Sequence, residues 1–212
     1  MNLHTSKKAL LERGLILPVM EMFYSVQGEG YNTGKAAFFI RIGGCDVGCY
    51  WCDVKESWDA SLHPLTAIDE ILGHVKKYPA QSAVITGGEP LLYNLDPLCR
   101  LLKENQISIF LETSGTLPLT GTFDWICVSP KPQILPRKDM LQLADELKVI
   151  IEKPEDLDFA TQSLSHLKKK CLLYLQPEWS QYNTILPVIV EYVLENPQWM
   201  ISLQSHKFMN IP

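Results

Sequence analysis

Short runs of β-branched and aromatic residues alternate along the chain with longer segments in which apolar residues recur at helical spacing. The short runs predict buried strands at residues 36–42, 83–86, 107–111, 125–128, 147–151, 171–175 and 200–203. The longer segments predict helices at residues 66–78, 95–104, 138–144, 155–168 and 182–194. Thr66 and Asp69 have the spacing of a capping pair, which favours a helix start at residue 66.

This order of elements predicts an α/β fold, because a strand, a helix and a second strand usually form a parallel pair with a right-handed crossover. A complete eight-unit barrel typically needs about 250 residues, whereas the chain has 212. We therefore expect an incomplete, TIM-like barrel of parallel strands with outer helices. Since no repeat or linker divides the sequence, we expect a single domain at residues 21–212 after an N-terminal extension at residues 1–20.

Clusters of glycine and polar residues follow directly after most of the predicted strands. They occupy residues 43–52, 87–90, 112–115, 129–131, 176–178 and 204–207. The carboxyl ends of parallel strands share one rim, and active sites of such folds lie there. Ordinary turns also collect glycine and polar residues, but that explanation leaves the charged and amide groups unexplained. The pattern therefore predicts one functional site at the rim.

Composition narrows the classes of function. With 46% hydrophobic residues the chain can bury a sizeable core, and a net charge of −5 argues against a nucleic-acid partner. No apolar run approaches the roughly 18 residues of a membrane-spanning helix, and no signal peptide is recognisable at the N-terminus. We expect a cytoplasmic protein whose cysteines are reduced and serve metal or redox chemistry more often than disulfides.

Three of the six cysteines, Cys45, Cys49 and Cys52, lie within eight residues. Structural zinc usually takes four closed ligands, and the nearest histidine is His63, eleven residues beyond Cys52. Three thiolates on a four-iron cluster instead leave one iron open for another ligand. The remaining cysteines lie in apolar contexts and predict core packing; they are Cys99, Cys127 and Cys171.

The spacing C-x3-C-x2-C, with Trp51 before the last cysteine, resembles the radical S-adenosylmethionine superfamily. Thr86-Gly-Gly-Glu-Pro90 resembles the glycine–glycine–glutamate element of that superfamily. The resemblance implies a 4Fe-4S cluster on the three cysteines and S-adenosylmethionine bound beside it. It implies that the residues binding this cofactor are Trp51, Gly88, Glu89, Glu112, Ser114, Ser129, Pro130, Lys131, Gln176, Pro177, Glu178 and Trp179.

Two further segments restrict the resemblance to one family of the superfamily. They are Phe23-Tyr-Ser-Val-Gln27-Gly-Glu29-Gly30 and the last nine residues. Over residues 22–212 the chain resembles the 7-carboxy-7-deazaguanine synthases, carbon–nitrogen lyases of queuosine and 7-deazapurine biosynthesis. These enzymes convert 6-carboxy-5,6,7,8-tetrahydropterin into 7-carboxy-7-deazaguanine and release ammonia. The resemblance implies a deoxyadenosyl radical that takes hydrogen from the substrate, and no side chain is predicted to act as a general acid or base.

The same resemblance implies a set of substrate-binding residues, which are Val26, Gln27, Gly28, Glu29, Arg41, Thr86, His206 and Pro212. The guanidinium of Arg41 suits a substrate carboxylate, although an interior salt bridge with Glu29 is the alternative. His206 and Lys207 could equally form a solvated tail. Pro212 is expected to contact the substrate through its terminal carboxylate.

Family members commonly carry a threonine two residues after the last cysteine, where its hydroxyl helps to hold a magnesium ion. This chain has Val54 there, next to Asp53, and valine offers no oxygen ligand. The magnesium site therefore stays unassigned, although the resemblance implies Mg²⁺ as a cofactor. It also implies a flavodoxin-like electron donor and a homodimer.

Two rival functions remain open from the sequence. A glycyl-radical activating enzyme shares the cysteine spacing and a small incomplete barrel, but it acts on a protein partner. A zinc or iron–sulfur binding module without enzymatic activity would explain the cysteines alone.

Overall fold

The computed structural model describes residues 6–212 and contains one nine-stranded sheet. In chain order its strands are β1 (Ile16–Val26), β2 (Ala36–Ile42), β3 (Leu65–Ala67), β4 (Ser82–Gly87), β5 (Ser108–Thr113), β6 (Trp125–Val128), β7 (Glu146–Ile151), β8 (Leu172–Pro177) and β9 (Trp199–Ile201). In space the order is β3-β1-β2-β4-β5-β6-β7-β8-β9. All neighbours from β2 to β9 pair in parallel, and β1 pairs antiparallel with β2 and β3.

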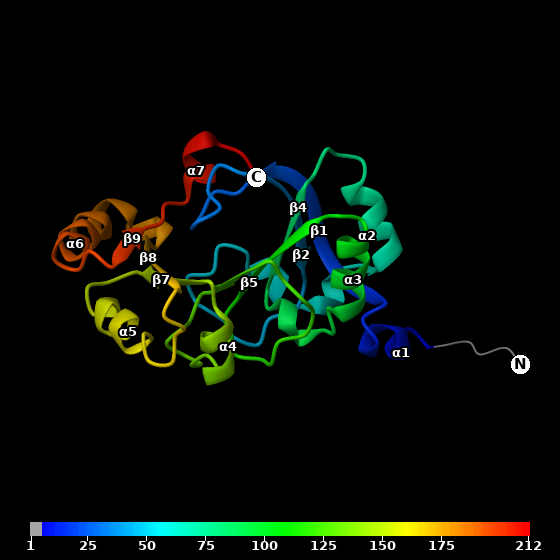
Figure 1. Ribbon diagram of the computed structural model, residues 1–212, viewed down its shortest axis with the longest axis horizontal. Helices are drawn as coiled ribbons and strands as arrows, with labels where there is room; N and C mark the ends of the chain where they lie inside the picture. Colours follow the sequence, from blue (N-terminus) through cyan, green and yellow to red (C-terminus); the bar gives the residue numbers. More distant parts are fainter. Residues whose placement is uncertain (1–5) are drawn as a thin grey trace, which may run out of the picture.

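Helices connect the parallel strands and lie outside the curved sheet (Figure 1). They are α2 (Ile68–Val75), α3 (Asp96–Glu104), α4 (Lys138–Leu143), α5 (Asp156–Gln162) and α6 (Tyr182–Glu195), with α1 (Lys7–Glu12) and α7 (Ser205–Met209) near the two ends. No pairing within residues 6–212 joins the edge strands β3 and β9. The structure therefore confirms the predicted incomplete barrel of parallel strands with outer helices.

The core lies between the sheet and the outer helices. Helix α2 buries Ile68, Ile71, Leu72 and Val75, a spacing that places them on one face of a 3.6-residue helix. The strands contribute apolar residues from β1 through to Trp199 in β9 to the main hydrophobic cluster, and Ala37, Phe39 and Val84 form a second, smaller one. Within the described part of the chain, no helix is both long and apolar enough to span a membrane.

The structure differs from the predicted elements at both ends of the chain. Strands β1 and β3 and helices α1 and α7 were not predicted, and residues 16–20 of the expected extension form the first half of β1. The pairing of β1 with β2 shifts between Val19 and Glu21, next to Pro18. Proline cannot donate to a ladder and is typical of such irregularities, so it obscured the strand pattern.

The expected capping pair is wrong. Thr66 belongs to β3, and α2 begins after Ala67 without a side-chain cap. The predicted helix at 155–168 is also too long, because α5 ends at Gln162. The spacing of apolar residues alone does not show where a short edge strand ends and the following helix begins.

The segment after β1 bridges the gap between the two ends of the sheet. The backbone N–H of Gly30 donates to Ser202 Oγ (2.9 Å), and that of Tyr31 donates to Glu146 Oε2 (3.1 Å). The Gly28 carbonyl accepts from both the backbone and the hydroxyl of Ser205 at the start of α7. In Figure 1 this segment accordingly runs beside α7 and the C-terminus. The open side of the barrel is thus covered by polar contacts rather than by strands.

Candidate active site

A cavity of about 300 Å³ lies where the strand ends and the bridging segments meet. This volume is within the range of small-molecule sites. Every cluster, cofactor and substrate residue expected from the sequence lines it, except Glu89 and Pro130. Segments far apart in the chain therefore share one space, as the position of the polar clusters predicted.

The cysteine loop forms one wall of the cavity. Cys45, Cys49 and Cys52 are free thiols and all three line it. Gly88 packs against this loop, because a Cβ at Gly88 would lie 2.2 Å from the Gly44 carbonyl oxygen and 2.8 Å from Cys45 Cβ. Only glycine permits this approach of β4 to the cysteine loop.

The three thiols fit a cluster better than a single ion. Within residues 6–212, no three His, Cys, Asp or Glu side chains converge closely enough to hold one metal ion. The thiols are instead spaced along the cavity wall, as needed where each thiolate holds a different iron of a 4Fe-4S cluster. The donor set is therefore suited to such a cluster with one iron left for an exogenous ligand.

Lys131 is the cation whose charge acts on the Cys49 thiol. Its ammonium donates to the Ser129 carbonyl (2.6 Å) and hydroxyl (2.7 Å) and lies 5.7 Å from the centre of the Trp51 ring. Burial lowers the pKa of Lys131 and raises the pKa of the Cys49 thiol. A cation held beside the thiols can offset the charge of thiolates or bind an anionic group of a ligand.

The other cysteines are packed away from this wall. Cys99 and Cys127 are buried, and Cys171 packs against the main core. Burial raises the pKa of Cys99 and of Cys171 to about 12, and that of Cys127 well above its usual value. The predicted core-packing role of these three residues is confirmed.

Glu89 braces the turn after β4 instead of lining the cavity. Its carboxylate accepts hydrogen bonds from Thr113 Oγ1 (2.7 Å), Ser114 N (2.9 Å), the Ser114 hydroxyl and Leu91 N (3.1 Å). Glu178 acts similarly at the turn after β8, where it accepts from the backbone N–H groups of Ser180 and Gln181. Glu178 nevertheless lines the cavity.

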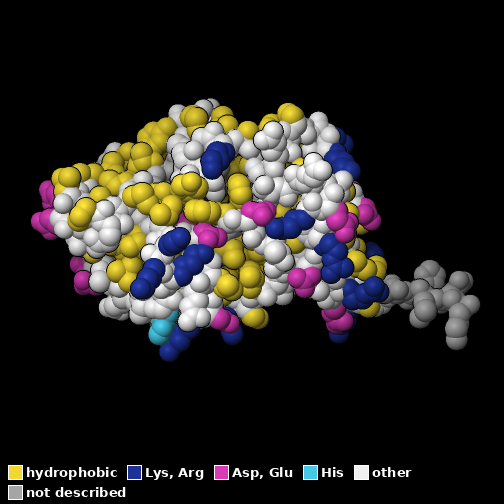
Figure 2. All heavy atoms as spheres, in the orientation of Figure 1, with side chains coloured by type: hydrophobic (Ala, Val, Ile, Leu, Met, Phe, Trp, Pro, Cys, Tyr) yellow, Lys and Arg dark blue, Asp and Glu magenta, His cyan; other side chains and the backbone are white. Residues whose placement is uncertain are grey.

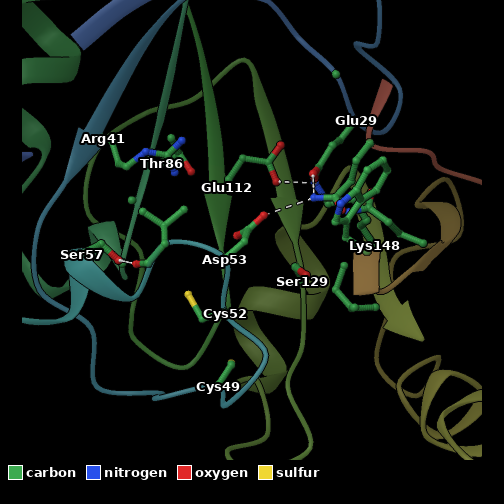
Figure 3. Close-up of a pocket in the computed structure, with 18 of the residues that line it drawn as sticks. Glu29, Arg41, Cys49, Cys52, Asp53, Ser57, Thr86, Glu112, Ser129 and Lys148 are labelled. Carbon is green, nitrogen blue, oxygen red and sulfur yellow. Dashed lines mark hydrogen bonds and ion pairs between the residues drawn. The ribbon is translucent and has the colours of Figure 1, made fainter. Parts of the chain in front are cut away.

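Two carboxylates and a lysine form the opposite wall. The Lys148 ammonium donates to Glu29 Oε2 (2.7 Å) and to Glu112 Oε2 (2.9 Å), as Figure 3 shows. The Gln204 amide donates to Glu29 Oε1 (2.9 Å), and the Gln27 amide donates to Glu112 Oε1 (3.5 Å). Burial alone would raise the pKa of Glu29, but the charge and hydrogen bond of Lys148 and the Gln204 amide lower it to about 2.

Arg41 does not form the salt bridge with Glu29 that was considered from the sequence. Its Nε donates to Glu21 Oε1 at 2.6 Å, because the two residues face each other in the pairing of β1 and β2. Arg41 also lines the cavity, together with Thr86 from the neighbouring strand. The guanidinium therefore remains available to a ligand on its cavity side.

The C-terminal segment covers the cavity rather than forming a solvated tail. His206 packs against Gly28, where a Cβ would lie 2.2 Å from His206 Nδ1. The Lys207 ammonium donates to Asp53 Oδ2 (3.0 Å), next to Cys52. The Ser25 hydroxyl donates to the terminal residue, at Pro212 O (3.0 Å). Both His206 and Pro212 line the cavity.

Sequence reasoning did not identify several residues of the cavity wall. Ser57 carries no local signal, since it lies within a short 3-10 helix, Lys55–Trp58. Gln204 belonged to the polar cluster at 204–207 but was given no role. The sequence position of Lys148 does indicate a buried ion pair, because this lysine stands inside an apolar strand segment, Glu146–Ile151. Lysine is almost never fully buried without a partner, so its position predicts a buried carboxylate, though not which one.

Comparison with known proteins identifies the superfamily. Residues 39–148, which run from within β2 to within β7 and include the cysteine loop, match the model of the Radical SAM superfamily. The crystal structure of QueE from Escherichia coli superposes with a TM-score of 0.82 at 32% identity, over 96% of this chain and 100% of that chain.

Curated relatives along the whole chain carry one name, 7-carboxy-7-deazaguanine synthase. The protein from Flavobacterium psychrophilum is 52% identical over 95% of this chain and 96% of its own length. Those from a Synechocystis species and from Escherichia coli are 46% and 34% identical, each over 92% of this chain and over 93% and 98% of their own lengths. The chain therefore belongs to the 7-carboxy-7-deazaguanine synthase family of the Radical SAM superfamily.

Proposed function

We propose that this protein converts 6-carboxy-5,6,7,8-tetrahydropterin into 7-carboxy-7-deazaguanine with release of ammonia, in the pathway to queuosine. One observation carries the proposal: the cysteine loop and the Glu29–Lys148–Glu112 wall line the same cavity. A site for radical chemistry and a site for a small polar ring are thus within one cavity. Family membership supports the same reaction.

The cluster and S-adenosylmethionine, when bound, supply an electron and an adenosyl radical. Cys45, Cys49 and Cys52 would hold the cluster, and Gly88 lets the turn after β4 pack directly against the loop that carries them. Further cofactor contacts come from the cavity-lining residues Trp51, Glu112, Ser114, Ser129, Lys131, Gln176, Pro177, Glu178 and Trp179. Glu89 acts indirectly, because its carboxylate is used to hold the Ser114 turn.

The opposite wall suits a pterin. Its aminopyrimidine edge carries N–H donors, and Glu29 and Glu112 offer carboxylate acceptors toward the cavity. The substrate carboxylate would bind the guanidinium of Arg41, as charge-assisted pairs are roughly twice as strong as neutral ones. Val26, Gln27, Gly28, Thr86, His206 and Pro212 would complete the binding surface.

The structure does not favour either rival function. A protein substrate would have to thread a backbone past α7, which the Lys207–Asp53 pair ties to the cysteine loop. A binding module without enzymatic activity needs no polar cavity opposite the cysteines, yet this one is lined by Glu29, Glu112 and Lys148.

Magnesium would bind more weakly here than in relatives with threonine at the Val54 position. The Val54 carbonyl accepts from the Ser57 hydroxyl (2.7 Å), which places an oxygen near the missing ligand, as Figure 3 shows. Asp53 offers a carboxylate, but Lys207 already pairs with it. Since magnesium keeps several waters and few protein ligands, these two groups with the substrate carboxylate form a weak site.

A homodimer, a flavodoxin-like donor and a cytoplasmic location complete the proposal. Apolar side chains gather on the face over α6, β9 and α7 (Figure 2). Exposed examples are Leu194, Phe208 and Met200, and β9 is an edge strand. A second copy of the chain is the occupant we propose for this face, because edge strands and apolar patches favour association.

Anaerobic turnover tests the proposed reaction and its cluster. Reconstituted protein with S-adenosylmethionine, reductant and carboxytetrahydropterin is expected to form an aromatic deazapurine and ammonia in equal amounts, detected by chromatography with mass spectrometry. Replacing Cys45, Cys49 or Cys52 with Ala should abolish both the cluster absorbance and product formation, because each thiolate holds one iron.

The matched controls are Cys99→Ala and Cys171→Ala, which remove thiols outside the cavity. Both should keep full iron content and turnover. A folded Cys49→Ala protein that retained four irons and made product would contradict the assignment, and failure of the unaltered protein to make a deazapurine would contradict the reaction.

Magnesium removal separates this chain from relatives with threonine. Turnover should fall less than about threefold on brief treatment with EDTA, because an enzyme without a hydroxyl ligand at residue 54 is expected to depend little on the ion. The Val54→Thr variant adds a hydroxyl ligand and should respond more strongly, with iron content measured as the control. Complete loss of activity in the unaltered protein, restored by magnesium, would show that Asp53, Ser57 or backbone groups already form a strong site.

Extension of the C-terminus tests its contact with substrate. A few residues appended after Pro212 remove its terminal carboxylate, which is expected to accept hydrogen bonds from the pterin. Hydrogen bonds to a charged group contribute about 1.5–3 kcal/mol each, so KM should rise by roughly one to two factors of ten. Cleavage of S-adenosylmethionine without substrate and the melting temperature should stay the same.

The control carries the same residues at the N-terminus. Equal kcat/KM in the unaltered and C-terminally extended proteins would show that Pro212 has no role in substrate binding.

A further inference from the structure

Lys148 is the most deeply buried charged group of the cavity wall. Only 4% of its side chain is exposed, although it stands in the middle of β7. A buried ammonium requires charged or hydrogen-bonding partners. It has two, Glu29 Oε2 at 2.7 Å and Glu112 Oε2 at 2.9 Å. The cysteine loop does not contribute to this contact.

Each of the two carboxylates is held at both oxygens. Beside Lys148, Glu29 accepts from the Gln204 amide and Glu112 accepts from the Gln27 amide. Their side chains are 20% and 23% exposed, and both line the cavity. The wall thus presents two fixed carboxylates side by side, with capacity left for further donors from a ligand.

Lys148 offsets a surplus of acidic groups. Glu146 lies two residues earlier in β7, and burial raises the pKa of its carboxyl. Cys127 in β6 is a neutral thiol, since burial raises its pKa well above the usual value. Without Lys148, Glu29 and Glu112 would repel each other in a poorly hydrated space. One of them would then bind a proton at neutral pH.

We propose that Lys148 is a positioning residue for the substrate, holding Glu29 and Glu112 together as ionised acceptors for a ligand edge with several N–H donors. The inference rests on the proposed function, which supplies the aminopyrimidine edge as that ligand. Lys148 itself acts through the two carboxylates. The two ionised carboxylates therefore favour ligand rings that carry N–H donors on adjacent nitrogens. They disfavour rings that carry hydrogen-bond acceptors at those positions.

The variant Lys148→Met removes the ammonium and keeps most of the side-chain length. We expect the Kd for carboxytetrahydropterin, measured by titration of the reconstituted protein without reductant, to rise by at least about tenfold. In an activity assay KM should rise by a similar factor, whereas kcat at saturation changes less. Binding of S-adenosylmethionine should change less, because Glu112 is the one expected contact of that cofactor that Lys148 holds.

The pH dependence provides a readout that a purely structural role would not change. In the native protein the pKa of Glu29 is about 2, so its carboxylate stays ionised throughout the neutral range. In Lys148→Met the shared proton is bound as the pH falls, and affinity should decline from pH 8.5 to 6.5. His206, Asp53, Lys131 and Lys207 also face the cavity in both proteins, so the difference between the two pH profiles is the measurement.

Two further variants keep the test decisive. Lys103→Met is the matched control, because it breaks a lysine–carboxylate pair of 2.9 Å with Asp124 outside the cavity; its affinity should equal that of the native protein. If Lys148→Met does not fold, the double variant Lys148→Met/Glu29→Gln removes one charge of each sign. That protein should bind the pterin at least about tenfold more weakly than the native protein.

Failure of this inference differs from failure of the proposed function. If the native protein does not bind the pterin, both are wrong. If it binds the pterin and a folded Lys148→Met protein binds with the same Kd and the same pH profile, Lys148 has no positioning role. Native affinity in the double variant would overturn the inference as well.

Discussion

The ion pair between Lys148 and Glu29 joins two parts of the barrel that the sheet leaves apart. β1 and β7 are separated by four strands in the sheet order, and no strand of the described chain closes the gap between β3 and β9. The segment after β1 crosses this gap and is tied to β7 by Lys148, to the chain just after β9 by Ser202 and to the start of α7 by Ser205. Because those ties are polar, the interior of the barrel contains a polar cavity rather than a continuous apolar core.

The incomplete barrel therefore determines where each kind of chemistry lies. The cysteine loop follows β2, at the rim where parallel strands end. The carboxylate wall comes from inside β5 and β7 and from the bridging segment. α7 closes the space between them, with Lys207 on Asp53 beside the cysteine loop. Such an arrangement shields a reactive intermediate from water, which is the protein's main contribution in a cofactor enzyme.

The cysteine loop and the rim were predictable because their signals are local. Strand ends, glycines and thiols stand next to one another in the sequence, and the parallel arrangement brings the separate clusters together. The contact of Lys148 with Glu29 was not predictable, since 119 residues separate them and no local pattern shows which carboxylate a buried lysine meets. For a related reason, the alternative partner considered for Arg41, Glu29, was wrong. Arg41 pairs with Glu21, which lies in β1, and Pro18 interrupts the sequence pattern of that strand. Glu89 looked like a ligand residue in sequence, but its carboxylate is used by the turn after β5.

An anaerobic crystal structure of the reconstituted protein with S-adenosylmethionine and carboxytetrahydropterin tests the central claim most directly, namely that one cavity holds both ligands against opposite walls. We expect the aminopyrimidine edge of the pterin within hydrogen-bond distance of Glu29 and Glu112, and its carboxylate near Arg41. S-adenosylmethionine is expected between Gly88 and the cluster held by Cys45, Cys49 and Cys52. A pterin bound outside this cavity, or one turned so that no N–H group meets either carboxylate, would contradict the account.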